Sequence, residues 1–121
     1  MIYLIGFVIF ILFVHYIGDF LLQSRKMADN KSKSLKWLSL HVLTYTLNLF
    51  IFTSFFIFDF GVSVLYWIAL NGVLHWITDF FTSKLTTYYY KREDWGSFFN
   101  VVGFDQFIHG ATLLITLLIW V

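Results

Sequence analysis

Imidazole and carboxylate side chains recur at a four-residue spacing in segments of the sequence that are otherwise apolar. The segment HYIGDF is echoed later in the chain by HWITDF, and DQFIH reverses the order of the two residue types. Because residues four apart lie on one face of an α-helix, each pair can present its side chains to the same neighbour. With one further His, the set comprises His15, Asp19, His41, His75, Asp79, Asp105 and His109.

These residue types are suited to binding a divalent metal ion. His nitrogen and carboxylate oxygen, in a chain without Cys, suit zinc, iron or manganese rather than copper(I) or an iron–sulfur cluster. A carboxylate inside a membrane costs about 2.5–3.5 kcal/mol on insertion scales, and a bound cation would offset that cost. The set exceeds the three or four ligands of one zinc. We therefore expect one or two divalent ions, with zinc as first choice and manganese or iron as alternatives.

Four long apolar runs must position these residues. The chain of 121 residues is 60% hydrophobic and only 12% charged, whereas a soluble domain is about a quarter charged. A membrane-spanning helix needs roughly 20 apolar residues. The predicted fold class is all-α, a polytopic membrane protein whose four transmembrane helices form one bundle and a single domain, residues 1–121. The predicted helices cover about 2–22, 37–58, 62–82 and 98–121.

The basic residues predict the orientation of the bundle. All eight Lys and Arg lie in two connections, between the first and second runs and between the third and fourth. The positive-inside rule places both connections in the cytoplasm and both termini outside, in a bacterial inner membrane. By composition, SRKMADNKSKS is a flexible, solvated loop that determines topology. A net charge of +1 gives no reason to expect nucleic-acid binding. The expected partners are membrane lipids, including a lipid substrate, and a homo-oligomer is left open.

The seven His and Asp residues also share one depth, about 6 to 16 Å below the cytoplasmic boundary at roughly 1.5 Å per residue. This predicts one inward-facing polar layer, in which catalytic roles fall to Asp19, Asp79 and Asp105. Apart from Ser39 near its rim, we expect no Ser, Cys or Lys in this layer, which favours direct attack by water. The repeated His/Asp spacing indicates two repeated helical hairpins. Residues expected to orient ligands or join helices are Gln23, Tyr45, Asn71 and Gln106.

The motifs resemble those of a family of small phage and bacterial integral membrane proteins classed as a domain of unknown function. The shared pattern is H-x-x-x-D-F-x-x-Q, a His in the second helix, N-x-x-x-H-x-x-x-D and D-Q-x-x-H, and it spans nearly the whole chain. The matching positions are His15, Asp19, Phe20, Gln23, His41, Asn71, His75, Asp79, Asp105, Gln106 and His109. More distantly, the pattern looks like that of inner-membrane proteins assigned as metal-dependent hydrolases.

Three classes of function follow from these observations. The first is a membrane-embedded hydrolase whose His/Asp di-metal site, near the cytoplasmic face, acts on a lipid-linked phosphoester or related headgroup. The second is a non-enzymatic metal-binding or transport protein, with haem between paired His as a variant. The third is a phage membrane protein acting on the host envelope. The confinement of the ionisable groups to the cytoplasmic half argues against transport.

Overall fold

The computed structural model describes residues 1–120, and among these residues it contains helices and no strand. Four helical stretches are long and apolar enough to cross a membrane: Ile2–Leu21, Leu35–Phe60, Ser63–Tyr90 and Trp95–Ile119. The predicted all-α class with four membrane-type helices is therefore confirmed. The last predicted helix ended at Val121, which lies outside the described residues.

The described residues form eight helical elements. The first stretch consists of α1 (Ile2–Tyr16) and the π-helical turn η1 (Ile17–Leu21), and the short helix α2 (Arg25–Asn30) follows it. The second stretch joins α3 (Leu35–Thr53), the 3-10 turn η2 (Ser54–Phe56) and α4 (Ile57–Phe60). The last two are the long helices α5 (Ser63–Tyr90) and α6 (Trp95–Trp120).

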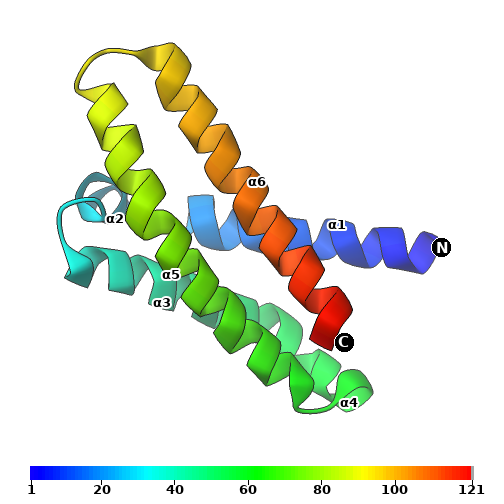
Figure 1. Cartoon of the computed structure of the whole chain (residues 1–121). Helices are drawn as coiled ribbons and strands as arrows, with labels where there is room; N and C mark the ends of the chain where they lie inside the picture. Colours follow the sequence, from blue (N-terminus) through cyan, green and yellow to red (C-terminus); the bar gives the residue numbers. More distant parts are fainter. Residues whose placement is uncertain (121) are drawn as a thin grey trace.

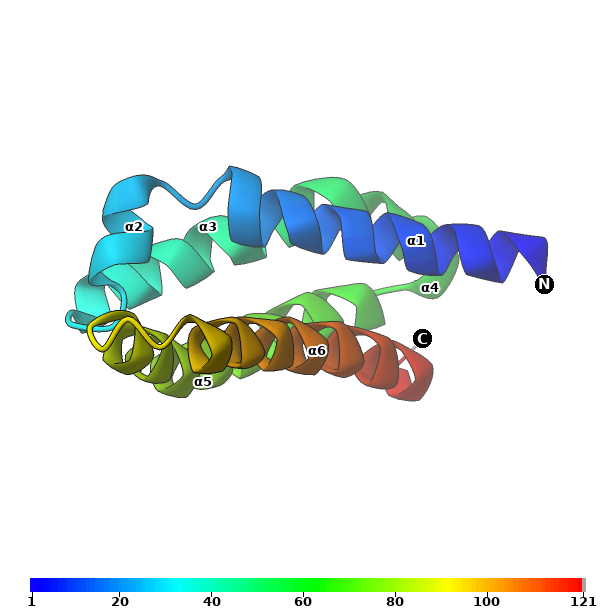
Figure 2. The same ribbon diagram turned by 90° about the horizontal axis from the view of Figure 1, so that it is seen from above.

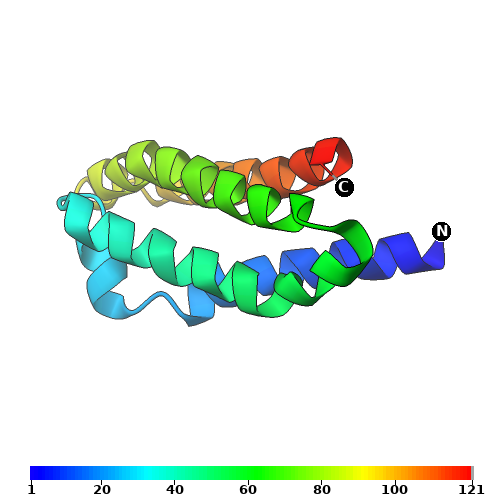
Figure 3. The same ribbon diagram turned by 90° about the horizontal axis from the view of Figure 1, so that it is seen from below.

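The helices form two layers (Figure 2; Figure 3). One layer holds α1 and α3, and the other holds α5 and α6. Helix α5 packs along both α6 and α3, whereas α1 and α6 make a shorter contact where they cross (Figure 1). The two basic connections, containing α2 and the α5–α6 link, lie at one end of the bundle, and both termini lie at the other. Which side of a membrane that end faces stays a prediction.

Three element boundaries differ from the sequence prediction. The segment predicted as a flexible loop contains α2, whose first turn is capped by the Ser24 hydroxyl accepting a hydrogen bond from Met27 N at 3.3 Å. Helix α5 continues to Tyr90 instead of ending near residue 82, because the polar stretch after the apolar run contains no Gly or Pro to stop it. Helix α6 begins at Trp95 rather than at residue 98.

Asp94 explains the early start of α6. Its carboxylate accepts a hydrogen bond from Ser97 N at 3.1 Å, which satisfies one of the free amide groups of the first turn. Hydrogen bonds from the hydroxyl and backbone N–H of Ser97 hold the pKa of Asp94 below its usual value. The charged cap therefore fixes the helix start within a segment that hydropathy alone reads as a loop.

The apolar core fills the half of the bundle nearer the termini, and the polar layer lies between this core and the basic connections. The indole Nε1 of Trp67 donates to the carbonyl of Leu113 at 3.2 Å, which joins α5 to α6 inside the core. Many large apolar side chains face outward, as expected for helices surrounded by lipid. The core cluster comprises Ile11, Val14, Tyr45, Leu49, Val64, Trp67, Ile68 and Leu113.

Candidate metal centre

A widened helical turn presents Asp19. The π-helical turn η1 is closed by a hydrogen bond from Leu22 N to Ile17 O at 2.9 Å, and such turns inside α-helices are frequent at functional sites. Gly18 packs against α3 so closely that a Cβ would lie 2.8 Å from Asn48 Nδ2. The absence of a side chain at Gly18 therefore lets η1 bring Asp19 against α3.

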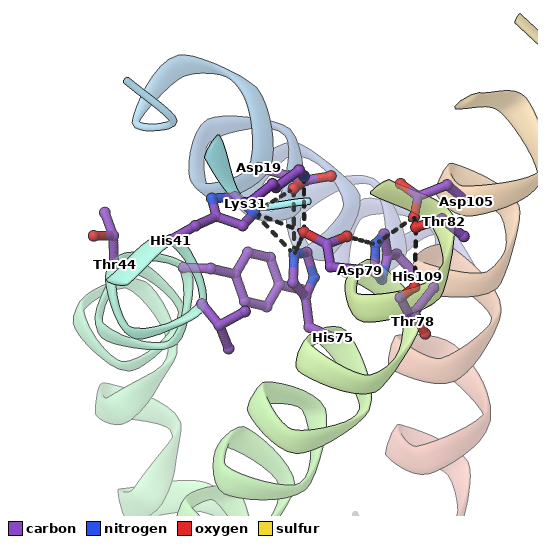
Figure 4. Close-up of polar contacts among 12 residues, drawn as sticks. Asp19, Lys31, His41, Thr44, His75, Thr78, Asp79, Thr82, Asp105 and His109 are labelled. Carbon is purple, nitrogen blue, oxygen red and sulfur yellow. Dashed lines mark hydrogen bonds and ion pairs between the residues drawn. The ribbon is translucent and has the colours of Figure 1, made fainter. Parts of the chain in front are cut away.

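Four donor atoms converge in the buried layer and form what we call the inner donor group: Asp19 Oδ1, His41 Nε2, His75 Nε2 and Asp79 Oδ2 (Figure 4). His41 Nε2 lies 3.1 Å from Asp19 Oδ1 and 3.2 Å from Asp79 Oδ2. The Nε2 atoms of His41 and His75 are 3.2 Å apart. His75 Nε2 also lies 3.3 Å from Asp19 Oδ1 and 3.6 Å from Asp79 Oδ2. All four residues are buried.

These separations match the corners of a tetrahedral metal site. His nitrogen and carboxylate oxygen bind zinc at about 2.0–2.2 Å, which places tetrahedral ligands roughly 3.3–3.6 Å from one another. Five of the six donor–donor distances run from 3.1 to 3.6 Å, and the sixth, between the two carboxylates, is within 4.8 Å. The Nε2 atoms of His41 and His75 face each other directly, and a shared metal ion would accept both lone pairs. This buried group could therefore hold a metal ion.

A second set of donors, which we call the outer donor group, consists of Asp19, Asp105 and His109, whose ligand atoms lie within 4.8 Å of one another. His109 Nε2 lies 3.3 Å from Asp105 Oδ1 and 3.1 Å from Asp79 Oδ1. Because Asp79 turns Oδ2 toward the inner donor group and Oδ1 toward His109, its carboxylate connects the two groups.

A directional chain of hydrogen bonds orients the carboxylates. The Gln106 amide nitrogen donates to Asp19 Oδ2 at 2.6 Å and to Asp105 Oδ2 at 3.1 Å. The Gln106 oxygen can only accept, so His15 Nε2–H donates to it at 2.9 Å. His15 Nδ1 then accepts from the Tyr45 hydroxyl at 3.2 Å. The chain fixes the His15 tautomer and leaves both carboxylates as acceptors, as expected around metal ligands.

Lys31 reaches into the polar layer from the connection that contains α2. Its Nζ lies 2.8 Å from Asp79 Oδ2, and its side chain is only 16% exposed. Burial would lower the pKa of Lys31, but the carboxylates of Asp79, Asp19 and Asp105 outweigh burial and raise the pKa above its ordinary value. The expectation that no Lys enters the layer was wrong. No periodic pattern marks Lys31, because it lies between helices.

Three other residues predicted for the site, His15, Asn71 and Gln23, belong to neither donor group. Both ring nitrogens of His15 face Gln106 and Tyr45, and His15 belongs to neither donor group, so its role as a ligand stays a prediction. Asn71 donates to Thr116 Oγ1 at 2.9 Å and joins α5 to α6 away from the donor groups. The Oε1 atom of Gln23 is buried without a hydrogen-bond partner among the described residues.

Sequence reasoning also missed Thr82, whose hydroxyl lies 2.5 Å from Asp105 Oδ1. Its position three residues after Asp79 is a usable signal, because that spacing keeps both residues on one helix face.

A cavity of about 620 Å³ lies against the donor groups at the end of the bundle that holds the basic connections. Its wall includes Asp19 and Asp105 of the outer donor group, together with Lys31, Thr82 and Gln106. Cavities of about 300–1,000 Å³ are typical of small-molecule sites. The cavity therefore gives a molecule at that end access to the candidate metal ligands.

Residues 7–121 match the family described as "Protein of unknown function (DUF3307)", so the chain belongs to this family. No curated protein and no solved structure matches the chain. Family membership confirms the resemblance based on the His and Asp motifs. Nothing in these comparisons supports the more distant resemblance to metal-dependent hydrolases, or a phage origin.

Proposed function

We propose that this chain is a membrane-embedded, metal-dependent hydrolase with two adjacent metal sites. The observation that carries the proposal is the inner donor group, in which five of the six separations between buried donor atoms are 3.1 to 3.6 Å, beside a cavity of about 620 Å³. The Asp79 carboxylate supports a pair of ions, because it gives one oxygen to each donor group. Two-metal hydrolytic sites hold their ions about 3.5–4 Å apart.

Bound ions would supply an activated water and electrophilic stabilisation of a phosphoryl oxygen. Asp105 stands on the cavity wall and would take the proton of the attacking water. The bond between phosphorus and the leaving alcohol then breaks, and that proton passes to the leaving oxygen. Thr82 and Gln106 each donate to one oxygen of Asp105 and hold it in place. We propose a lipid-linked phosphoester as substrate, since the cavity opens where the apolar helices meet polar connections.

Transport is less well supported by the arrangement of the core. Toward the termini, residues 1–14, 42–58, 62–74 and 110–120 contain no His, Asp, Glu, Lys or Arg that could continue a route for ions. Haem is also poorly supported. The His75 and His109 rings stack at a centroid distance of 3.9 Å with an interplanar angle of 13°, which leaves no space for a porphyrin between them.

The proposal is tested by turnover of a lipid panel in detergent micelles. Phosphomonoester, phosphodiester and diphosphate lipids should be supplied to zinc- and manganese-loaded protein, with release of product measured by mass spectrometry. We expect one class to be hydrolysed by the wild-type chain and by Asp59→Asn, a control in the exposed turn at the opposite end. Asp105→Asn should lose at least about a hundredfold in rate, because it removes a ligand of the outer donor group as well as the general base, and general acid–base groups alone contribute about 10²–10⁴-fold. Absence of turnover by metal-loaded protein across the panel would contradict hydrolysis.

A further inference from the structure

The cavity beside the donor groups carries two cationic side chains without a partner. Lys33 and Lys91 both line it, and among the described residues neither has a carboxylate within ion-pair distance. The acidic residues of the cavity wall already have partners. Asp29 pairs with Arg25 at 3.8 Å, for example, and Asp105 accepts from Thr82 and Gln106. Lys33 and Lys91 are therefore the cationic groups of the cavity wall that an anionic ligand could pair with.

The two lysines are brought together by a contact between their elements. The Thr87 hydroxyl donates to Ser32 Oγ at 2.9 Å, which fastens the connection carrying Lys33 to the end of α5. Lys91 follows Thr87 by one helical turn, so Lys33 and Lys91 come from two elements that meet at this end of the cavity. Ser83, one helical turn after Asp79, also lines the cavity; it is 5% exposed, and within the part of the chain that the structure describes its hydroxyl has no hydrogen-bond partner. A buried hydroxyl without a partner is costly unless a ligand satisfies it.

Apolar side chains complete the cavity wall. Phe20 from η1, with Phe98 and Val102 from α6, lines the side between the first and last spans, where α1 and α6 make only a short contact. Phe20 is 46% exposed on the outer surface of the bundle. An acyl chain lying between these residues would pass from the cavity into the surrounding lipid.

We propose that this cavity binds a phosphate-bearing amphiphile, with the phosphate held by Lys33, Lys91 and Ser83 and the acyl chain leaving past Phe20. The assignment of this cavity as a substrate site rests on the proposed function. The inference extends that function by naming the residues that select the headgroup. Lysine is a point-charge ligand for phosphate, and two ammonium groups favour an anionic headgroup over a zwitterionic one.

Binding should be measured calorimetrically on the full chain in an uncharged detergent, with EDTA present so that neither metal binding nor turnover contributes. The probes are dihexanoyl phosphatidic acid, dihexanoyl glycerol with the same chains but no phosphate, and inorganic phosphate. We expect saturable binding of the phosphatidic acid and at least about tenfold weaker binding of the other two probes. In the double variant Lys33→Gln/Lys91→Gln, affinity for the phosphatidic acid should fall about tenfold, because two solvent-accessible charge contacts are lost. Ser83→Ala should lower it a few-fold.

The matched control is Lys26→Gln/Lys36→Gln, which removes the same charge from exposed lysines that do not line the cavity. Its affinity should equal that of the wild-type chain. Equal loss in both double variants, equal binding of dihexanoyl glycerol, or no binding of the phosphatidic acid would overturn the inference. Equally tight binding of inorganic phosphate would overturn the amphiphile as occupant. Because metal is chelated throughout, neither metal binding nor turnover contributes to the measured affinities.

Discussion

Lys31 Nζ lies 2.8 Å from Asp79 Oδ2, the same oxygen that faces His41 in the inner donor group. An ammonium from a connecting segment thus neutralises a carboxylate that a metal ion would also use. Removing one partner of a buried ion pair leaves the other charge uncompensated, and a cation then gains more by binding there. The Lys31 ammonium therefore competes with a metal ion for the Asp79 carboxylate, in addition to contributing to the positive charge of its connection.

Lys31→Met should therefore tighten metal binding, by about tenfold if the competing contact is worth about 1.4 kcal/mol. The measurement is a zinc titration of detergent-solubilised protein against a chromophoric chelator. Lys36→Met, at an exposed lysine in the first turn of α3, should leave the affinity unchanged. Weaker zinc binding by Lys31→Met would instead mean that the ammonium helps to assemble the site.

Gly18→Ala should disturb the position of Asp19. The new Cβ would lie 2.8 Å from Asn48 Nδ2 and 2.9 Å from Tyr45 Cδ2, so η1 must move away from α3. We expect a loss of about 1–3 kcal/mol in the free energy of unfolding, as for other overpacked sites, and at least tenfold weaker zinc binding. Thermal unfolding in detergent and the chelator titration measure the two effects. In the control Gly103→Ala the Cβ meets nothing within 4 Å, and both quantities should stay within error or improve slightly.

Gln106→Met should weaken metal binding about 10- to 100-fold, the range observed when outer-shell partners of metal ligands are removed. The substitution keeps the side-chain length and deletes the donors to Asp19 and Asp105. Gln23→Met, on the same cavity wall but without a recorded hydrogen bond to a ligand, is the comparison and should change zinc affinity by less than about threefold. An equal loss of zinc affinity in the two variants would show that Gln106 does not orient the metal ligands.

Asn71→Ala should separate a structural role from a ligand-orienting one. Asn71 donates to Thr116 Oγ1 and to the Trp67 carbonyl, so its loss should lower the free energy of unfolding by about 1–2 kcal/mol. The number of metal ions bound per chain should not change. If the Asn71→Ala variant still elutes as folded protein but loses metal, Asn71 supports the metal ligands and is not only a contact between α5 and α6.

Much of this architecture could be predicted from the sequence, because the signals are long or repeated. Apolar runs give the four helices, and the spacing of His75 and Asp79 on one helix gives a shared face. Their common depth with His41 predicts that helices far apart in sequence bring these residues together. Each of these inferences rests on helical periodicity, which the bilayer enforces by requiring every backbone amide to be satisfied within a helix.

The remaining features depend on packing, which periodicity does not encode. The π-helical turn at Asp19 follows from the fit of Gly18 against α3, and the inward course of Lys31 follows from the presence of α2. The equivalence of His15 and His75 also fails in detail. His75 faces three other donor atoms, whereas His15 is engaged by Tyr45 and Gln106. A motif can therefore repeat while the chemical role of its residues diverges.

Metal stoichiometry tests the central claim most directly. Protein purified in mild detergent, loaded with zinc or manganese and passed through a desalting column should be assayed by elemental analysis. We predict two ions per chain for the wild type and for Asp59→Asn, one for Asp105→Asn, and fewer than one for Asp19→Asn, because Asp19 is the residue that belongs to both donor groups. A folded wild-type chain that retains neither metal after loading would contradict the account.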